Sequence, residues 1–125
     1  MREASAKLAI RVAQLNEAQE ISSLSARVYP PEDAYTASQI LGQINNFPEG
    51  VFVAEYEGKI VGYCATSIIE EALALRQHTW DEITGGGFGS RHNPDGDVLY
   101  GIEVCVDPAY RRLRIGQRFY RARRE

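Results

Sequence analysis

The sequence predicts a single α+β domain in which helices lie against a mostly antiparallel sheet. Three features indicate this: two early stretches with helical spacing, two alternating apolar runs joined by a short turn, and a later strand that leads directly into a basic helix. A length of 125 residues allows one domain, spanning 1–125, with one hydrophobic core. The composition, 44% apolar and 25% charged, is that of a globular protein.

The first strand and helix are predicted from the N-terminal third of the chain. Lys7 to Ala13 alternates between apolar and polar residues, as a half-buried strand does. Asn16 stands where an N-cap would, so we expect a helix over Glu17–Val28. This helix would bury one apolar stripe in the core, formed by Ala18, Ile21, Leu24 and Val28.

A second helix is expected after the proline pair Pro30–Pro31, which restricts the backbone and ends the first helix. Thr36 followed three residues later by Gln39 is a capping-box pattern, so we place the helix start at Thr36. The segment "NNFPEG" ends it.

The region from Val51 to Ile69 is predicted to be an antiparallel hairpin with Gly58 in its turn. Residues 70–97 carry a weak pattern, with a short helix possible in "EEALALRQHTW" and a glycine-rich loop after it. A strand over Val98–Val106 follows, and then a helix over Gly116–Glu125.

Positive charge is concentrated at the end of the chain. Residues 111–125 contain seven arginines and one glutamate, a net charge of +6, whereas the preceding 110 residues sum to −9. Such a local excess predicts an anionic ligand at this place, with a solvated basic helix face as the alternative. Nucleic acid is disfavoured as the ligand because its binders usually spread basic residues over a face and interleave exposed aromatics, whereas the rest of this chain is acidic.

The turn between the last strand and the last helix is the expected anion site. A strand that ends in a short loop and enters a helix directs free backbone N–H groups toward one point, which favours phosphate. Arg111, Arg112 and Arg114 line this loop, and Gly116 allows close approach of the backbone. A diphosphate is the ligand that this pattern fits best.

These residues carry a family resemblance. "VDPAYRRLRIG" resembles the acyl-CoA-binding motif of the GNAT superfamily of N-acyltransferases, whose pattern Q/R-x-x-G-x-G/A falls on Arg111 to Gly116, and the order of the other elements fits that family along nearly the whole chain. The resemblance implies a GNAT-like layered fold, acetyl-CoA as acyl donor and an amine acceptor. The implied cofactor-binding residues are Val104, Cys105 and Val106 along the pantetheine arm, and Arg111, Arg112, Leu113, Arg114, Ile115 and Gly116 at the pyrophosphate.

A narrower resemblance is to the N-terminal acetyltransferase-like module of bacterial proteins in which a carbon–nitrogen hydrolase domain follows. Its segments include "LSARVYP", "FPEGVFVAEY" and "ITGGGFGSRH". Two departures from the family stand out: the first motif glycine is Arg114, and the strand and helix that follow the motif helix in a complete GNAT domain are absent. The resemblance therefore predicts that the C-terminal part of the domain is missing, and that the catalytic acid lies beyond residue 125.

Acyl transfer to an amine needs a base, donors for the oxyanion and an acid for the thiolate. Strand alternation places Tyr100, Ile102, Val104 and Val106 on one face, and Glu103 on the other with Gly101 and Cys105. Glu103 is the expected catalytic base, with pairing to an arginine of the basic segment as the alternative. The oxyanion donor would be a backbone N–H near Val104 or Cys105. Cys105 itself is disfavoured as a nucleophile because no histidine is placed predictably beside it.

The remaining chemistry-bearing residues fit structural roles. His78 and His92 lack a second ligand at metal-binding spacing, so they are expected at the surface and no metal is expected. "GGGFG" lacks the end of a phosphate-binding P-loop and is interpreted as a flexible lid or a turn. Tyr29, Tyr35, Trp80 and Phe88 are either acceptor-pocket or packing residues. Cys64 and Cys105, in strand-like runs, are expected as reduced, buried thiols.

Localisation and association follow from the same analysis. No apolar run is long enough to cross a membrane and the N-terminus lacks a signal-peptide pattern, so the cytoplasm is expected. Without a partner strand, Val98–Val106 would be an apolar edge, and we expect self-association through it. A non-catalytic acyl-CoA-binding or docking module attached to a hydrolase is the alternative function.

Overall fold

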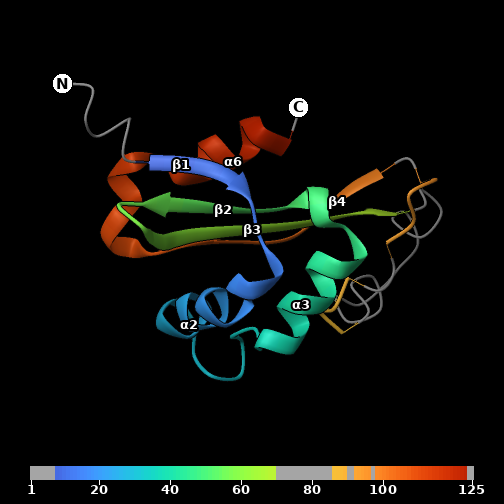
Figure 1. Ribbon diagram of the computed structural model, residues 1–125, viewed down its shortest axis with the longest axis horizontal. Helices are drawn as coiled ribbons and strands as arrows, with labels where there is room; N and C mark the ends of the chain where they lie inside the picture. The colour runs from blue at the N-terminus through green and yellow to red at the C-terminus, as the bar shows by residue number, and fades with distance from the viewer. Residues whose placement is uncertain (1–7, 70–85, 90–91, 97, 124–125) are drawn as a thin grey trace.

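The computed structural model describes residues 8–69, 86–89, 92–96 and 98–123, apart from the side chains of residues 111, 112 and 123. Its helices and strands follow the order expected from the sequence (Figure 1). The elements are β1 (Leu8–Val12), α2 (Ala18–Val28), α3 (Ala37–Asn46), β2 (Val51–Tyr56), β3 (Lys59–Ile69), β4 (Val98–Val106) and α6 (Ile115–Arg123), with 3₁₀ turns η1 (Leu15–Glu17), η2 (Pro48–Gly50) and η3 (Pro108–Leu113).

The four strands form one antiparallel sheet in the order β1-β2-β3-β4. Helices α2 and α3 cover one face and α6 covers the other (Figure 1). Each face has its own apolar cluster: Ile21, Leu24 and Ile40 belong to the first, and Ile115 and Phe119 to the second. The expected α+β layered fold is confirmed.

The first helix begins differently from the prediction. Asn16 is not its N-cap; it lies inside η1, and α2 starts at Ala18. The Glu17 carboxylate accepts from the Gln14 backbone N–H at 2.9 Å, and it is also held by Arg11 at 2.5 Å. Because this carboxylate holds the backbone of Gln14, three residues before it in the chain, the turn forms earlier than an Asn16 cap would require.

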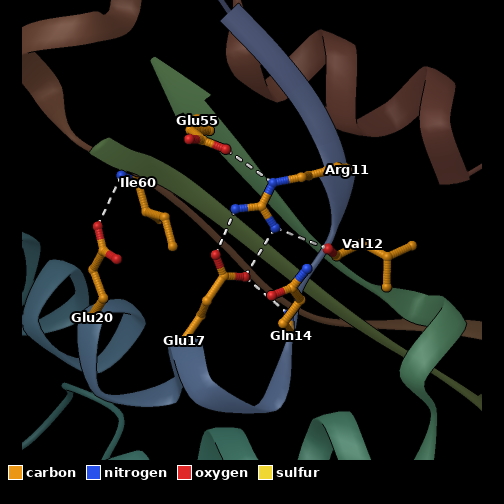
Figure 2. Close-up of polar contacts among 7 residues, drawn as sticks. All are labelled: Arg11, Val12, Gln14, Glu17, Glu20, Glu55 and Ile60. Carbon is orange, nitrogen blue, oxygen red and sulfur yellow. Dashed lines mark hydrogen bonds and ion pairs between the residues drawn. The ribbon is translucent and has the colours of Figure 1, made fainter. Parts of the chain in front are cut away.

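Arg11 joins the start of this helical segment to the sheet. Its guanidinium lies between the carboxylates of Glu17 and Glu55, with the Nε to Glu55 Oε1 distance at 3.0 Å (Figure 2). The Glu20 carboxylate accepts from the Ile60 backbone N–H at 3.1 Å (Figure 2). These contacts fix α2 over β2 and β3, and so set where its C-terminal end meets β4.

The second helix and the hairpin are confirmed as predicted. Thr36 Oγ1 accepts from the Gln39 N–H at 3.1 Å and Gln39 Oε1 accepts from the Thr36 N–H at 3.0 Å, which is the expected capping box. In the hairpin turn Glu57 and Gly58 both have positive φ, +52° and +81°, as a tight two-residue turn requires.

Within the described residues the sheet ends at β4, whose outer edge has no paired strand. Val104, on this strand, is 42% exposed. The exposed edge is thus present as expected, and self-association through it stays a prediction.

Candidate functional site

The corner between β4 and α6 begins with Asp107, which fixes the end of the strand. Its N–H donates to the Val61 carbonyl at 2.9 Å, and its carboxylate accepts from the Ala109 N–H at 3.0 Å. Its backbone carbonyl accepts from the Tyr110 N–H at 2.9 Å. The chain then continues as the 3₁₀ turn η3, where the sequence predicts a short loop.

Arg114 sits at the point where η3 meets α6, and its backbone is left-handed, with φ at +56°. Its carbonyl accepts from the Arg118 N–H at 3.2 Å and so begins the helix. The N–H groups of the first helical turn have no acceptor within the helix, and the dipole places positive charge there. The loop thus keeps the conformation that favours glycine even though an arginine occupies it.

Gly116, in the first turn of α6, is exposed, and apart from its chain neighbours and the backbone of its own helix a Cβ built on it would meet no protein atom within 4 Å. Its φ is not positive. Neither packing nor backbone geometry therefore requires a glycine here, and a helical position disfavours one by about 1 kcal/mol relative to alanine. A ligand that approaches the backbone closely would explain the residue.

The other predicted motif residues divide between surface and core. Ile115 is buried against the sheet and Leu113 packs beside it, so their side chains serve the core and only their backbone faces the corner. Arg114 is exposed. The side chains of Arg111 and Arg112 lie outside the described part of the chain.

Glu103 lies on the face of β4 that α2 covers, near the Tyr29 hydroxyl, which donates to the Val104 carbonyl at 3.4 Å. Burial raises the pKa of this carboxyl, and the neighbouring Tyr29 hydroxyl and Val104 N–H lower it again in part. Among the described residues, the ion pairs in the structure do not include Glu103. The alternative of an arginine partner thus has no support in the described part of the chain.

The strict alternation predicted for β4 is wrong at one position. The pairing with β3 runs from Ala65–Glu103 to Thr66–Gly101, which leaves Ile102 as an extra residue in a β-bulge. Ile102 and Cys105 therefore face the same core cluster instead of opposite faces. A bulge depends on pairing with a distant strand, so a local sequence pattern does not reveal it.

Cys105 is almost fully buried and is not in a disulfide. Burial first, and then the nearby Glu103 carboxylate, raise the pKa of its thiol to about 12. A protonated, enclosed thiol is a poor nucleophile, which agrees with the prediction. Cys64 is also buried and outside any disulfide, on the opposite face of the sheet.

The structure separates the four aromatic candidates for an acceptor pocket. Tyr29 and Tyr35 both lie near Glu103, whose charge raises the pKa of each phenol after the larger effect of burial. Phe88 packs instead against α3, where a Cβ on Gly42 would meet its carbonyl oxygen at 2.9 Å. Trp80 lies outside the described residues.

The "GGGFG" segment is a turn in its described part, residues 86–89. Three amide side chains of α3 hold its carbonyls: Gln39 donates to Gly86 at 2.9 Å, Gln43 to Gly87 at 2.6 Å, and Asn46 to Phe88 at 3.1 Å. The Gln43 bond is buried, and the Tyr63 hydroxyl extends it by donating to Gln43; this connection was not foreseen from the sequence. Spacing of Gln39, Gln43 and Asn46 along one helix face is the signal that could have indicated it.

His92 is half-buried and not a free surface residue. Its ring stacks on Phe47 with centroids 4.2 Å apart, and its Nδ1 accepts from the Ile68 N–H at 3.0 Å. His78 lies outside the described residues. Among the residues that the structure describes, no three metal-ligating side chains cluster, and no helix there has the length and apolar character needed to cross a membrane.

Comparisons with known proteins agree with this architecture. The model of the Acetyltransferase (GNAT) family matches residues 15–123. Two curated relatives from Bacillus subtilis (strain 168) are similar: the probable hydrolase YhcX, 39% identical over 95% of this chain, and the uncharacterized N-acetyltransferase YkwB, 32% identical over 88% of it. The chain spans only 23% of the first and 50% of the second.

Two solved structures share the fold over 91% of this chain. One is the GphF GNAT-like decarboxylase in complex with isobutyryl-CoA, with a TM-score of 0.77 and 26% identity, and the other is the loading GNATL domain of CurA from Lyngbya majuscula, with a TM-score of 0.78 and 20% identity. The chain covers 58% and 55% of them. Because the family model matches most of its length, the chain belongs to the GNAT family of acetyltransferases.

Proposed function

We propose that this chain is an N-acyltransferase domain that binds acetyl-CoA at the β4–α6 corner and passes its acetyl group to an amine. Gly116 is the observation that carries the proposal, because the fold itself gives no reason for a glycine in the first turn of α6. The pyrophosphate would lie on the backbone N–H groups of Arg112 to Gly116, beside the positive end of the helix. Arg114 would add a charged contact.

The pantetheine arm would lie along the outer edge of β4. The Asp107 to Val61 hydrogen bond fixes the phase of the ladder between β4 and β3. In an antiparallel ladder, residue pairs that exchange backbone hydrogen bonds alternate with pairs that do not. The Cys64–Val104 pair is one without such bonds, so the backbone N–H and C=O of Val104 point away from β3. An amide-bearing arm can pair with such an edge, and the Val104 N–H is the candidate donor to the thioester carbonyl oxygen.

In the proposed reaction the amine nitrogen attacks the thioester carbon while both substrates are bound. A C–N bond forms, the C–S bond breaks, and CoA leaves as the thiolate. Glu103 takes the proton of the attacking amine, for which a carboxylate in a partly buried site is suited. The acid that protonates the thiolate is not assigned to a residue of this chain.

The alternative is an acyl-CoA-binding or docking module without catalysis, attached to a carbon–nitrogen hydrolase. It is favoured by one observation: a relative named as a probable hydrolase is more than four times the length that this chain matches. Such a module would use the same corner but would not need Glu103. A decarboxylase activity, for which one structural neighbour is named, would likewise act on an acyl-CoA at this corner.

Calorimetric titration of CoA and dephospho-CoA tests the proposed site, in the 125-residue chain and in a form extended beyond residue 125. We expect Gly116→Ala and Arg114→Ala each to weaken binding about tenfold, the effect of one charged hydrogen bond or one steric conflict. Arg121→Ala is the matched control, since it removes the same charge from an exposed site near the other end of α6.

The outcomes separate the proposals. Equal losses for Arg114→Ala and Arg121→Ala would indicate a general basic surface, and no binding at all would favour a docking module. Given binding, Glu103→Gln separates a transferase from a sensor. Turnover with acetyl-CoA and an amine panel should be lost while CoA affinity is kept; an active Glu103→Gln variant would exclude Glu103 as the base.

A further inference from the structure

The end of β3 extends past the start of β2, and there a histidine side chain takes the place of a neighbouring strand. In the described pairing β2 begins at Val51 opposite Ala65, and β3 continues beyond this point. The Ile68 N–H donates to His92 Nδ1 at 3.0 Å, and the Ile68 carbonyl accepts from the Asn93 N–H at 2.7 Å. Because the N–H and C=O of a strand residue point to the same side, these two bonds close one edge of β3.

The imidazole of His92 is held through both its ring and its backbone. The ring stacks on Phe47, with the centroids 4.2 Å apart and the planes 17° from parallel. The Phe47 ring is itself fixed, because it fills the space beside Gly50 and leaves no room for a Cβ there. The His92 N–H donates to the Gly89 carbonyl at 3.2 Å, and the Ser67 hydroxyl lies 3.5 Å from Nδ1. These contacts keep Nδ1 directed toward β3.

The bond from Ile68 determines the protonation state of His92. A backbone N–H can only donate, so Nδ1 accepts and carries no proton, and the neutral ring has its proton on Nε2. Protonation at Nδ1 would place a second N–H against that of Ile68 and remove the bond. Burial lowers the pKa of His92, and the charge of Glu49 opposes this effect only in part. The folded chain therefore favours the neutral ring.

Few charged groups lie on the described elements that pack against the ring. The titratable or charged side chains there are Glu49 of η2, Tyr100 of β4, which pairs with Ser67, and Asp95 of the ring's own segment. Helix α3 carries none, and neither do the residues of β3 after Ala65. Of this set, Glu49 is the group whose charge favours a protonated His92.

The same segment reaches the candidate site. Gly89, which accepts the His92 N–H, belongs to the turn over residues 86–89 that α3 holds. A Cβ on Gly89 would meet Ile102 Cδ1 at 3.8 Å, so this turn lies against the β4 bulge next to Glu103. Release of His92 would therefore loosen the packing beside the candidate base.

We propose that His92 is an acid-sensitive latch: its neutral ring joins residues 92–96 to the end of β3, and protonation at Nδ1 opens this connection. Folding lowers the pKa of His92. The stability that the latch contributes is thus fully present above the pKa of a histidine in the unfolded chain, about 6.5. It is lost as the pH falls through the pKa that the ring has in the folded protein. An effect of opening on turnover rests on the proposed function, whereas the latch itself does not.

Hydrogen exchange of the Ile68 amide, measured by NMR in the ligand-free chain and divided by the intrinsic rate at each pH, reports directly on the latch. In the wild type the protection of this amide should fall about three- to tenfold between about pH 8 and about pH 5, the effect of one hydrogen bond. The Asp107 amide, which donates to the Val61 carbonyl near the other end of β3, is the internal control and should keep its protection.

Two substitutions separate the acceptor from the titration. His92→Asn keeps an acceptor oxygen near the place of Nδ1 but does not titrate, so the Ile68 amide should stay protected at both pH values. His92→Phe keeps a ring that can stack on Phe47 but has no acceptor, so the protection should be low at both. His78→Asn removes the other histidine of the chain, and this matched control should retain the pH dependence of the wild type.

Three results would overturn the latch: an Ile68 protection that is independent of pH in the wild type, an equal fall of protection in His92→Asn, or a proton on Nδ1 at neutral pH in long-range ¹H–¹⁵N spectra. These measurements require no turnover, so they distinguish the latch from the proposed function. A latch that opens in a protein without transferase activity would refute the proposed function alone.

In an active transferase, the turnover of His92→Asn relative to the wild type should rise on acidification. The ratio cancels the ionisation of Glu103 and of the amine, which both proteins share. A ratio that does not change with pH, together with the expected hydrogen exchange, would keep the latch but refute its effect on the site.

Discussion

Replacement of Arg114 by glycine should change stability and ligand affinity in opposite directions. Arg114 has φ at +56°, a left-handed conformation that costs an L-residue about 1–2 kcal/mol. Glycine removes this cost but adds about 0.5–1 kcal/mol of backbone entropy lost on folding. The Arg114→Gly protein should therefore gain about 0.5–1 kcal/mol of unfolding free energy, which is about 2–5 °C in Tm for a chain of this size.

Urea denaturation and calorimetric titration with CoA, performed on the same samples, test this reasoning. Arg114→Ala is the control, because alanine keeps the Cβ and therefore the strain, while it loses the charge. Both variants should bind CoA more weakly, but only the glycine variant should be more stable than the wild type. A less stable Arg114→Gly protein would show that the arginine side chain stabilises the corner by more than its backbone costs, and would refute the strain argument.

Three further changes test other parts of the structure. A Cβ at Gly62 would lie 2.9 Å from Ile115 Cγ2, so Gly62→Ala should destabilise the fold by about 1–3 kcal/mol and weaken CoA binding by displacing α6. Calorimetry measures both effects, and unchanged stability and affinity would contradict this packing. The pKa of Glu103 is raised in the folded state. The stability that this carboxyl contributes is therefore fully present below the pKa of a glutamate in the unfolded chain, about 4.3. It is lost as the pH rises through the pKa that the carboxyl has in the folded protein. The unfolding free energy of Glu103→Gln should therefore rise relative to that of the wild type between pH 4 and pH 7 in denaturant titrations. A constant difference between the two proteins would refute the raised pKa. Tyr63→Phe leaves the buried Gln43 carbonyl without its donor and should cost about 1–3 kcal/mol in urea; no loss would indicate that another group satisfies it.

The parts of the fold that depend on near neighbours in sequence were predictable. The Thr36–Gln39 capping box and the Gly58 turn use residues within three positions of each other, and both formed as expected. The start of the first helix was not, since the carboxylate that fixes it is shared with Arg11, a residue of β1. A sequence pattern places Asn16 at the cap because it does not include the competing partner.

The candidate site shows the same division. The basic corner and Gly116 are visible as composition and spacing, whereas the Ile102 bulge beside Glu103 and the approach of Tyr29, 74 positions earlier in the chain, are not. Antiparallel pairing decides where an extra residue is inserted, and that pairing is formed between strands joined by about thirty residues. The chemistry of the site could be proposed from residue types, but its geometry required the tertiary contacts.

The position of the corner itself depends on a glycine remote from it in sequence. Gly62 lies in β3, paired with Val106 at the end of β4. Side chains of Ile115 and Phe119 occupy the space above it, so that a Cβ there would meet them at 2.9 and 3.2 Å. This close approach sets α6 against the sheet with its N-terminus beside the end of β4. A bulkier residue at Gly62 would lift the helix and separate its free N–H groups from the strand edge, although every motif residue would remain in the sequence. Gly62 therefore belongs to the requirements of the proposed acyl-CoA site as much as Gly116 does, one through helix packing and the other through access to the backbone.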